Sequence, residues 1–147
     1  MPSLRNQAER TLLIQRLQSL APQTKPLWGK LDAPRLLCHL GDSLAMGLGD
    51  LPTQSVNKKA FHHFPLKHLI VYVLPIPKNV PTAPELLSTE PGNFESDRRR
   101  VVESITRMAA EPHGHGPEHP FFGPLSTEEW NALQAKHIDH HLRQFGL

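Results

Sequence analysis

The sequence "KHIDHHLRQFGL" at the end of the chain contains three histidines within five residues, at positions 137, 140 and 141. On a helix each residue advances by about 100°, so His137 and His141 project from one face, one turn apart. Trp130 and Leu133 fall on the same stripe, which indicates that this face is turned toward the core. His140 lies at the margin of the stripe. These histidines are therefore not simply a solvated helix end.

Two imidazoles at positions i and i+4 can bind one metal ion. The alternative interpretation is a pair of core histidines that hydrogen-bond to their neighbours. Burying two imidazoles is costly unless each ring nitrogen has a partner, and a metal ion supplies that partner. The sequence also permits an H-x2-H pair through His140, so His141 is the less certain of the two ligands on this helix.

A third ligand is expected from another helix. His39, in "LLCHLGDS", borders the apolar stripe made by Leu36, Leu40 and Leu44. It is either a ligand at the edge of the buried face or a partly exposed helix histidine. The other histidines have weaker patterns. We interpret His113, His115 and His119 as a pocket rim, an adventitious metal binder or a turn, and His62, His63 and His68 as structural or exposed.

Other polar or reactive residues have ordinary interpretations. Cys38 is expected to be a small buried hydrophobe, since no base is placed to activate it. Asp42 follows the candidate ligand His39 by three residues and is interpreted as a solvated aspartate. The alternative is that it supports the ligand as a hydrogen-bond partner or acts as a general base. Trp28 and Trp130 are expected to anchor the core, and Arg98–Arg100 to face solvent.

The elements that must position these residues are four amphipathic helices. The first is expected at about residues 3–20, and the second runs from an N-cap at Asp32 to about residue 49. The third is expected at about residues 94–110, with Asn93 as its N-cap. The fourth begins with a capping box at Ser126 and Glu129 and ends at about residue 144. A long proline-rich crossover, about residues 50–92, separates the second helix from the third. Within this crossover "FPLKHLIVYVL" is a short helix or a strand. A second stretch, "EPHGHGPEHPFFGP", is expected to be an irregular linker between the third and fourth helices. The predicted fold is all-α: a single four-helix-bundle domain spanning residues 1–147.

Composition excludes several classes of function. The 147 residues are 38% hydrophobic, with a net charge of +2 and a single tyrosine, so we expect no nucleic-acid partner. One cysteine, a polar N-terminus and apolar stretches too short for a bilayer indicate a cytoplasmic protein without membrane contact. The sequence contains no P-loop, dinucleotide fingerprint, nucleophile elbow or HExxH motif.

Two stretches, "KPLWGKLDAPRLLCHL" and "HPFFGPLSTEEWNALQAKHIDHHLRQFGL", resemble the DinB/YfiT-like superfamily, in a branch labelled only as a domain of unknown function. The resemblance covers nearly the whole chain. It implies a four-helix bundle whose metal is held by one histidine of the second helix and an H-x3-H pair of the last. Carried over to this sequence, the implied ligands are His39, His137 and His141.

The resemblance also bears on function, since characterised relatives include thiol-dependent transferases and a maleylpyruvate isomerase. Three neutral imidazoles leave a divalent ion with its full charge and an open position, which is typical of catalytic sites. Such an ion makes water or a thiol nucleophilic near neutral pH. We therefore expect a zinc, nickel or iron enzyme that acts on a small molecule, with a low-molecular-weight thiol as cosubstrate, and a homodimer. The alternative is a non-catalytic bundle that serves as a dimerisation or binding module.

Overall fold

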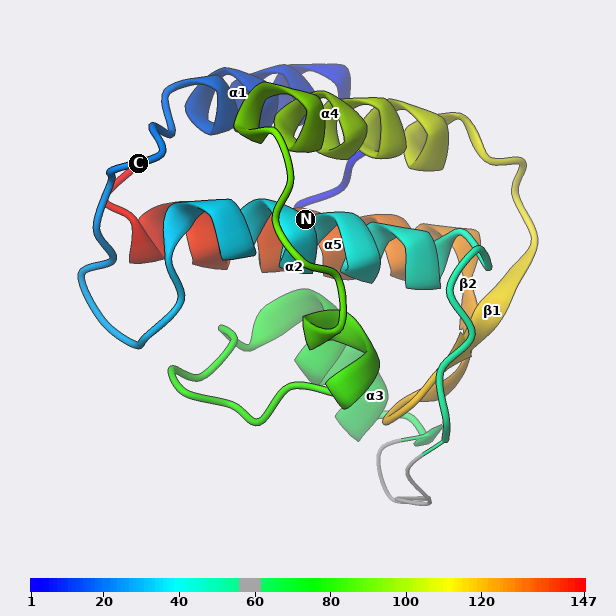
Figure 1. The fold of residues 1–147 in the computed structure, drawn as a ribbon. Coiled ribbons are helices and arrows are strands. Elements are labelled where there is room, and N and C mark those ends of the chain that lie inside the picture. Colours follow the sequence, from blue (N-terminus) through cyan, green and yellow to red (C-terminus); the bar gives the residue numbers. More distant parts are fainter. Residues whose placement is uncertain (56–61) are drawn as a thin grey trace.

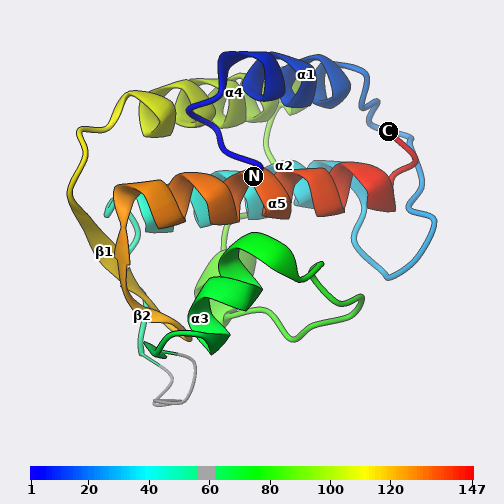
Figure 2. The same ribbon diagram turned by 180° about the vertical axis from the view of Figure 1, so that it is seen from behind.

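The computed structural model describes residues 1–55 and 62–147, and the chain is mostly helical. The long helices are α1 (Gln7–Gln18), α2 (Ala33–Gly47), α4 (Phe94–Ala110) and α5 (Thr127–Gln144). Helices α1 and α4 form one layer, and α2 and α5 form a second layer beneath it (Figures 1 and 2). The described residues between α2 and α4 lie on the other side of the second layer. Helices α2 and α5 are thus enclosed from both sides.

Local capping decides where the long helices begin. The side chain of Asp32 accepts the Arg35 N–H at the start of α2, and Ser126 forms a capping box with Glu129 at the start of α5. Helix α4 begins after the expected N-cap, Asn93. Helix α1 is shorter than predicted. It begins at Gln7, four residues beyond the predicted start at residue 3, because the Asn6 side chain caps the N–H groups of Ala8 and Glu9.

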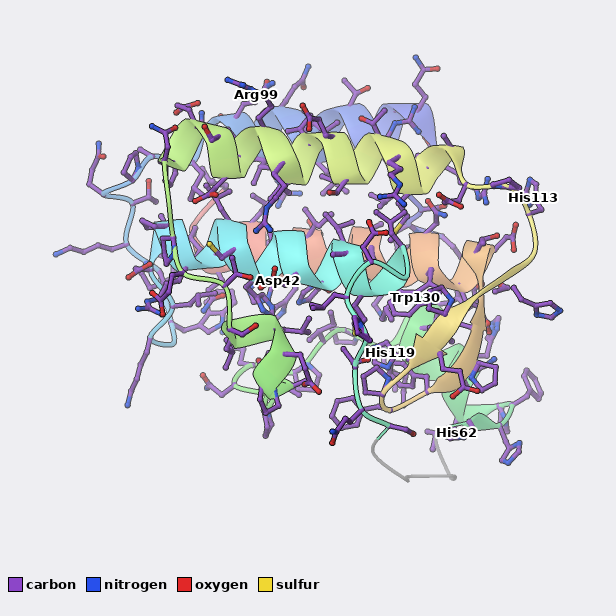
Figure 3. The ribbon with its side chains drawn as sticks, turned by 45° about the vertical axis from the view of Figure 1, so that its right-hand side comes forward. Asp42, His62, Arg99, His113, His119 and Trp130 are labelled. Carbon is purple, nitrogen blue, oxygen red and sulfur yellow. The ribbon has the colours of Figure 1, made fainter. Side chains whose placement is uncertain are left out.

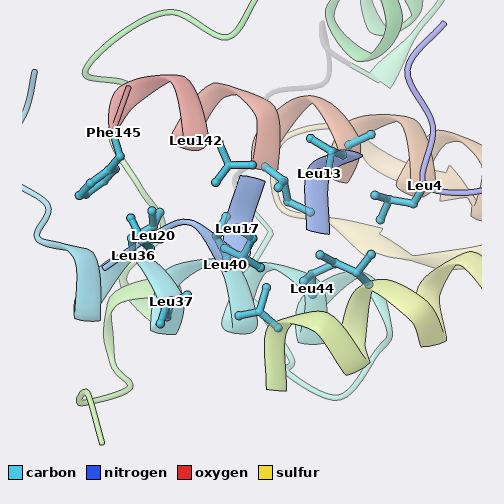
Figure 4. Packing of buried hydrophobic residues seen from close by; sticks show 14 of the residues in the cluster. Leu4, Leu13, Leu17, Leu20, Leu36, Leu37, Leu40, Leu44, Leu142 and Phe145 are labelled. Carbon is cyan, nitrogen blue, oxygen red and sulfur yellow. The ribbon is translucent and has the colours of Figure 1, made fainter. Parts of the chain in front are cut away.

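The main core lies between the two helical layers (Figure 4). It is built mostly from leucine side chains, with contributions from each long helix. Its fully buried members include Leu17, Leu36, Leu40, Leu44, Val101, Ile105, Ile138 and Leu142. Burial of a leucine or isoleucine contributes about 1.5–3 kcal/mol, so these contacts set the positions of α2 and α5 independently of their histidines.

The described parts of the crossover between α2 and α4 are irregular, and three short helical segments lie in them. These are α3 (Leu66–His68), the π-helical η2 (Leu69–Val73) and the 3-10 helix η3 (Pro84–Leu87). The apolar stretch "LIVYV" is therefore helical rather than a strand. The Lys136 ammonium of α5 donates to the carbonyls of Ile70 and Leu74, which ties η2 to α5. No helix in the described ranges has both the length and the apolar content to cross a membrane.

The prediction of an all-α chain is wrong in one place. Residues expected to form an irregular linker form an antiparallel hairpin of β1 (His115–His119) and β2 (Gly123–Ser126). Trp130 holds the hairpin against α5, since its Nε1 donates to the Pro117 carbonyl at 2.8 Å. A Cβ at position 116 would lie 2.4 Å from the Trp130 ring, so this close approach requires a glycine at that position. Tertiary contact with the indole, not strand periodicity, stabilises the hairpin.

Candidate metal centre

Three histidines from two helices converge between the second helical layer and the crossover. His39 comes from α2, and His137 and His141 come from α5. The Nε2 atom of His137 lies 3.0 Å from that of His39 and 3.1 Å from that of His141. One ligand atom from each residue fits within a 4.8 Å span. Two nitrogens on one tetrahedral zinc ion are about 3.3–3.4 Å apart, so small side-chain shifts are enough to bind an ion.

Two of the three imidazoles have their tautomer set by an oxygen that can only accept a hydrogen bond. The Nδ1–H of His39 donates to the Leu86 carbonyl of η3 at 3.3 Å. The Nδ1–H of His141 donates to Gln144 Oε1 at 2.8 Å. The amide of Gln144 is itself oriented, because its Nε2 donates to the Trp28 carbonyl at 2.9 Å. Both histidines therefore direct the lone pair of Nε2 toward His137.

His137 is supported from its other ring nitrogen by a small polar network. Its Nδ1 lies 3.2 Å from the Ser43 hydroxyl. Gln134 Nε2 donates to the Ser43 carbonyl at 3.0 Å and to its hydroxyl at 2.9 Å, while Gln134 Oε1 lies within reach of the same hydroxyl. The hydroxyl can thus accept from His137 and donate to Gln134. This arrangement is the hydrogen-bonded support that metal-ligating histidines commonly have.

The three imidazoles carry too few ring protons for all of their Nε2 atoms to be hydrogen-bonded to one another. His137 carries one ring proton, and a proton on Nε2 can bridge to only one of its two neighbours. At least one Nε2···Nε2 contact therefore brings two lone pairs together at about 3 Å. An additional proton is disfavoured near neutral pH. Burial lowers the pKa of His39, lowers that of His141 to about 3 and, reinforced by the other imidazoles, lowers that of His137 well below its usual range.

A cavity of about 220 Å³ opens beside the cluster. His39, His141 and Gln144 line it on the side of the cluster. The rest of its lining includes Trp28 and the crossover residues Ile76, Pro77, Asn79, Val80 and Thr82. None of its lining residues is acidic. The Lys78 ammonium lies 4.3 Å from the centroid of the Trp28 ring. The cavity gives a small molecule access to one side of the histidine cluster.

His140, the alternative ligand, lies outside the cluster but lines the same cavity. Its ring meets the Trp28 ring edge-on, with centroids 6.0 Å apart. The structure thus separates the histidines of the last helix into two in the cluster and one on the cavity wall. Burial lowers the pKa of His140, so it too favours the neutral form.

Asp42 is buried, which contradicts the prediction of a solvated aspartate. It accepts a hydrogen bond from Thr89 at 2.9 Å, and its Oδ1 lies 3.6 Å from the Arg100 guanidinium. These contacts face the crossover and α4 (Figure 3), and no hydrogen bond to the cluster is seen among the described residues. Cys38 is buried as expected, and burial raises the pKa of its thiol, so it is not an activated nucleophile.

Among the remaining aromatic and basic residues, some lie where the sequence predicts and others do not. Trp130 is a core anchor, as predicted, whereas Trp28 lines the cavity instead. Arg99 is exposed, as predicted for all three consecutive arginines, but Arg98 is partly buried and donates to the Leu20 carbonyl. Arg100, as above, pairs with Asp42.

The other histidines do not join the cluster in the described parts of the chain. His113 is exposed at the start of the hairpin and contacts Glu128, and His115 begins β1. His119 packs against Trp130 (Figure 3). His63 is exposed, and His62 and His68 are partly buried, in agreement with a structural or exposed role.

Sequence reasoning did not single out the residues that orient the three histidines. The spacing in the sequence could have indicated most of these residues, because each lies one helical turn from a candidate ligand. Ser43 follows His39 by four residues. Gln134 and Gln144 lie three residues from His137 and His141, respectively. The Leu86 carbonyl had no such signal, because its approach depends on the path of the crossover.

A known protein family matches almost the whole chain. Residues 9–146 match the model of a family described as a protein of unknown function, DUF1569. No curated protein and no solved structure matches the chain. Because the match spans both histidine-bearing helices and the crossover between them, the chain belongs to the DUF1569 family.

Proposed function

We propose that this protein is a divalent-metal-dependent enzyme of the DinB/YfiT-like type, with His39, His137 and His141 as the metal ligands. The observation that carries the proposal is the convergence of three Nε2 atoms while the Nδ1 atoms face hydrogen-bonding oxygens. Neutral imidazoles are the protonation state that metal binding requires, and burial favours it here.

A divalent ion bound in this way lowers the pKa of a coordinated water or thiol and thereby supplies a nucleophile near neutral pH. The chain contributes the other requirements. Leu86, Ser43 and Gln144 keep the imidazoles oriented. The Trp28 side chain and residues of the crossover form part of the cavity wall, and His140 also lines the cavity, where it can accept a proton from a bound small molecule.

The reaction class that fits this arrangement is transfer or hydrolysis of a small molecule, with a low-molecular-weight thiol as the proposed cosubstrate. Three nitrogen ligands and a cavity-facing side are typical of catalytic sites rather than closed structural ones. Imidazole ligands suit zinc, nickel and iron alike, so the proposal extends to any of these ions.

The proposal includes the architecture and setting that accompany this type of enzyme. The layer of α1 and α4 and the layer of α2 and α5 support a DinB-like four-helix bundle, to which the crossover and the hairpin are added. A homodimer and a cytoplasmic location are also proposed, the latter because a lone buried cysteine suits a reducing compartment. Light scattering that shows a monomer at tens of micromolar would remove the dimer from the proposal.

The deciding experiment is elemental analysis of protein purified without a histidine tag, followed by assays of thiol transfer and hydrolysis with and without added zinc, nickel or iron. About one ion per chain, with turnover that depends on it, supports the proposal. Metal binding without turnover for any substrate class would favour the non-catalytic binding module. Absence of stoichiometric metal would refute the site itself.

A further inference from the structure

A second cavity, lined only by apolar residues, lies next to the cavity at the histidines. Its volume is about 440 Å³, and its walls come from η2 and the loop after it and from the hairpin turn. The lining residues include Ile70, Leu74, Pro81 and Phe122. This volume falls in the range of about 300–1,000 Å³ that is typical of small-molecule sites, and a purely apolar lining selects an apolar occupant.

The two cavities share part of their wall. Pro77 and Val80 line both of them, so a single turn of the crossover separates the histidine side from the apolar side. The Val80 side chain in this shared wall is 50% exposed, so it is not packed tightly between the two cavities. A molecule with its polar end at His39 and His141 can therefore continue into the apolar cavity.

Solvent exposure of the apolar wall argues that something covers it. Leu74 is 46% exposed although it belongs to the cavity lining. A second protein chain would need about 800 Å² of surface on each partner, whereas this feature is a concave hollow beside a candidate metal site. A small molecule that extends from the metal site fits the hollow better than a flat protein surface does.

We infer that the substrate of the histidine site is amphipathic, with a metal-binding head in the 220 Å³ cavity and a hydrocarbon tail in the 440 Å³ cavity. This inference rests on the proposed function, since it assigns the head to the metal. It narrows the substrate class to molecules such as acyl or alkyl derivatives, for which tail length contributes to affinity.

The test uses straight-chain hydroxamates from acetohydroxamate to octanohydroxamate, titrated calorimetrically into the zinc-loaded full-length protein. Primary amides of the same chain lengths, which chelate weakly, are the head-group control. Each methylene that enters an apolar cavity is expected to tighten Kd by about two- to fourfold, up to the length that fills it. Hydroxamates should bind more tightly than the matching amides at every length.

Two exposed residues provide matched variants. Leu74→Gln places a polar side chain in the apolar wall and should remove most of the dependence of Kd on chain length. Val73→Gln changes its neighbour, which is 57% exposed and does not line this cavity, and should keep that dependence. Circular dichroism and the thermal midpoint establish that both variants are folded.

The outcomes separate the inference from the proposed function. Tight hydroxamate binding with no dependence on chain length, or with an equal dependence in Leu74→Gln, overturns the amphipathic substrate and leaves the metal site standing. Equal affinity of each hydroxamate and its matching amide at every chain length overturns the role of the metal, and with it the single substrate spanning both cavities. Preference for the hydroxamate head, together with a chain-length dependence lost only in Leu74→Gln, supports both.

Discussion

Gln144 orients His141 because its side-chain amide is held on both sides. Its Nε2 donates to the Trp28 carbonyl at 2.9 Å, which leaves Oε1 to accept the Nδ1–H of His141 at 2.8 Å. A backbone carbonyl in the loop before α2 thus determines which nitrogen of a histidine near the end of α5 carries the proton. The contact links the cavity wall to the orientation of a candidate metal ligand.

Replacing Gln144 with leucine is expected to weaken zinc affinity by about 10- to 100-fold, because the Nδ1–H of His141 loses its acceptor and the ring its orientation. Competition titration with a chromophoric chelator measures this change. Gln15→Leu, at an exposed position of α1, is the matched control and should bind zinc like the wild type. Equal affinity in both variants would show that the amide does not support the ligand.

The three cluster histidines are expected to account for the metal stoichiometry. The triple variant His39→Ala, His137→Ala, His141→Ala should lose the single bound ion, whereas His140→Ala should retain it, because His140 lies on the cavity wall outside the cluster. Elemental analysis after dialysis against zinc gives the ratio directly. Loss of the ion in His140→Ala alone would point to the H-x2-H pair instead.

If the site is catalytic, His137→Ala should abolish metal-dependent turnover and leave the helices folded, because the leucine core between the layers contains none of the three ligands. Turnover in the thiol-transfer and hydrolysis assays, with far-ultraviolet circular dichroism as the control, tests this. Full metal-dependent activity in His137→Ala would end the catalytic proposal.

Metal removal should lower the thermal midpoint. An ion that binds only the folded chain stabilises it by RT ln(1 + [L]/Kd), about 2.7 kcal/mol when its free concentration is 100 times Kd. Excess EDTA should therefore lower the midpoint of the wild type and leave that of the triple alanine variant unchanged. The same shift in both proteins would place the stabilising ion elsewhere.

His119 is expected to make the fold sensitive to acid. Burial against Trp130 and Phe122 lowers the pKa of His119 to about 3, below the value of about 6.5 in an unfolded chain. The unfolded state binds more protons between these two values, so stability is full above pH 6.5 and falls as the pH drops toward 3. From pH 6.5 to 4.5 the loss due to this residue is at most about 3 kcal/mol, at 1.36 kcal/mol per pKa unit.

The comparison for His119 is the variant His119→Asn, whose side-chain oxygen can replace Nδ1 as acceptor for the N–H groups of the hairpin turn. Urea unfolding of both proteins, metal-free and at several pH values, gives the two stability curves. The free energy of unfolding should fall less steeply with acidification in the variant. Parallel curves would show that protonation of His119 does not oppose folding.

Local signals in the sequence determined the helical framework. Caps at Asp32, Asn93 and Ser126 act within one turn of chain, so the starts of α2, α4 and α5 follow from nearby residues. The H-x3-H spacing likewise places His137 and His141 on one helical face wherever the helix lies. Helix α1 was the exception, because Asn6 offered a better cap than the predicted start at Ser3.

Only the tertiary structure decided how these parts meet. His39 was expected at the edge of a buried face, but it is 5% exposed because the crossover covers that side of α2 and brings the Leu86 carbonyl to its ring. The hairpin and the burial of Asp42 have the same origin, since each depends on a partner far along the chain: Trp130 for the hairpin, Arg100 and Thr89 for the aspartate. Helical periodicity records which face a residue occupies, whereas the partner that packs on that face is set by contacts between distant segments.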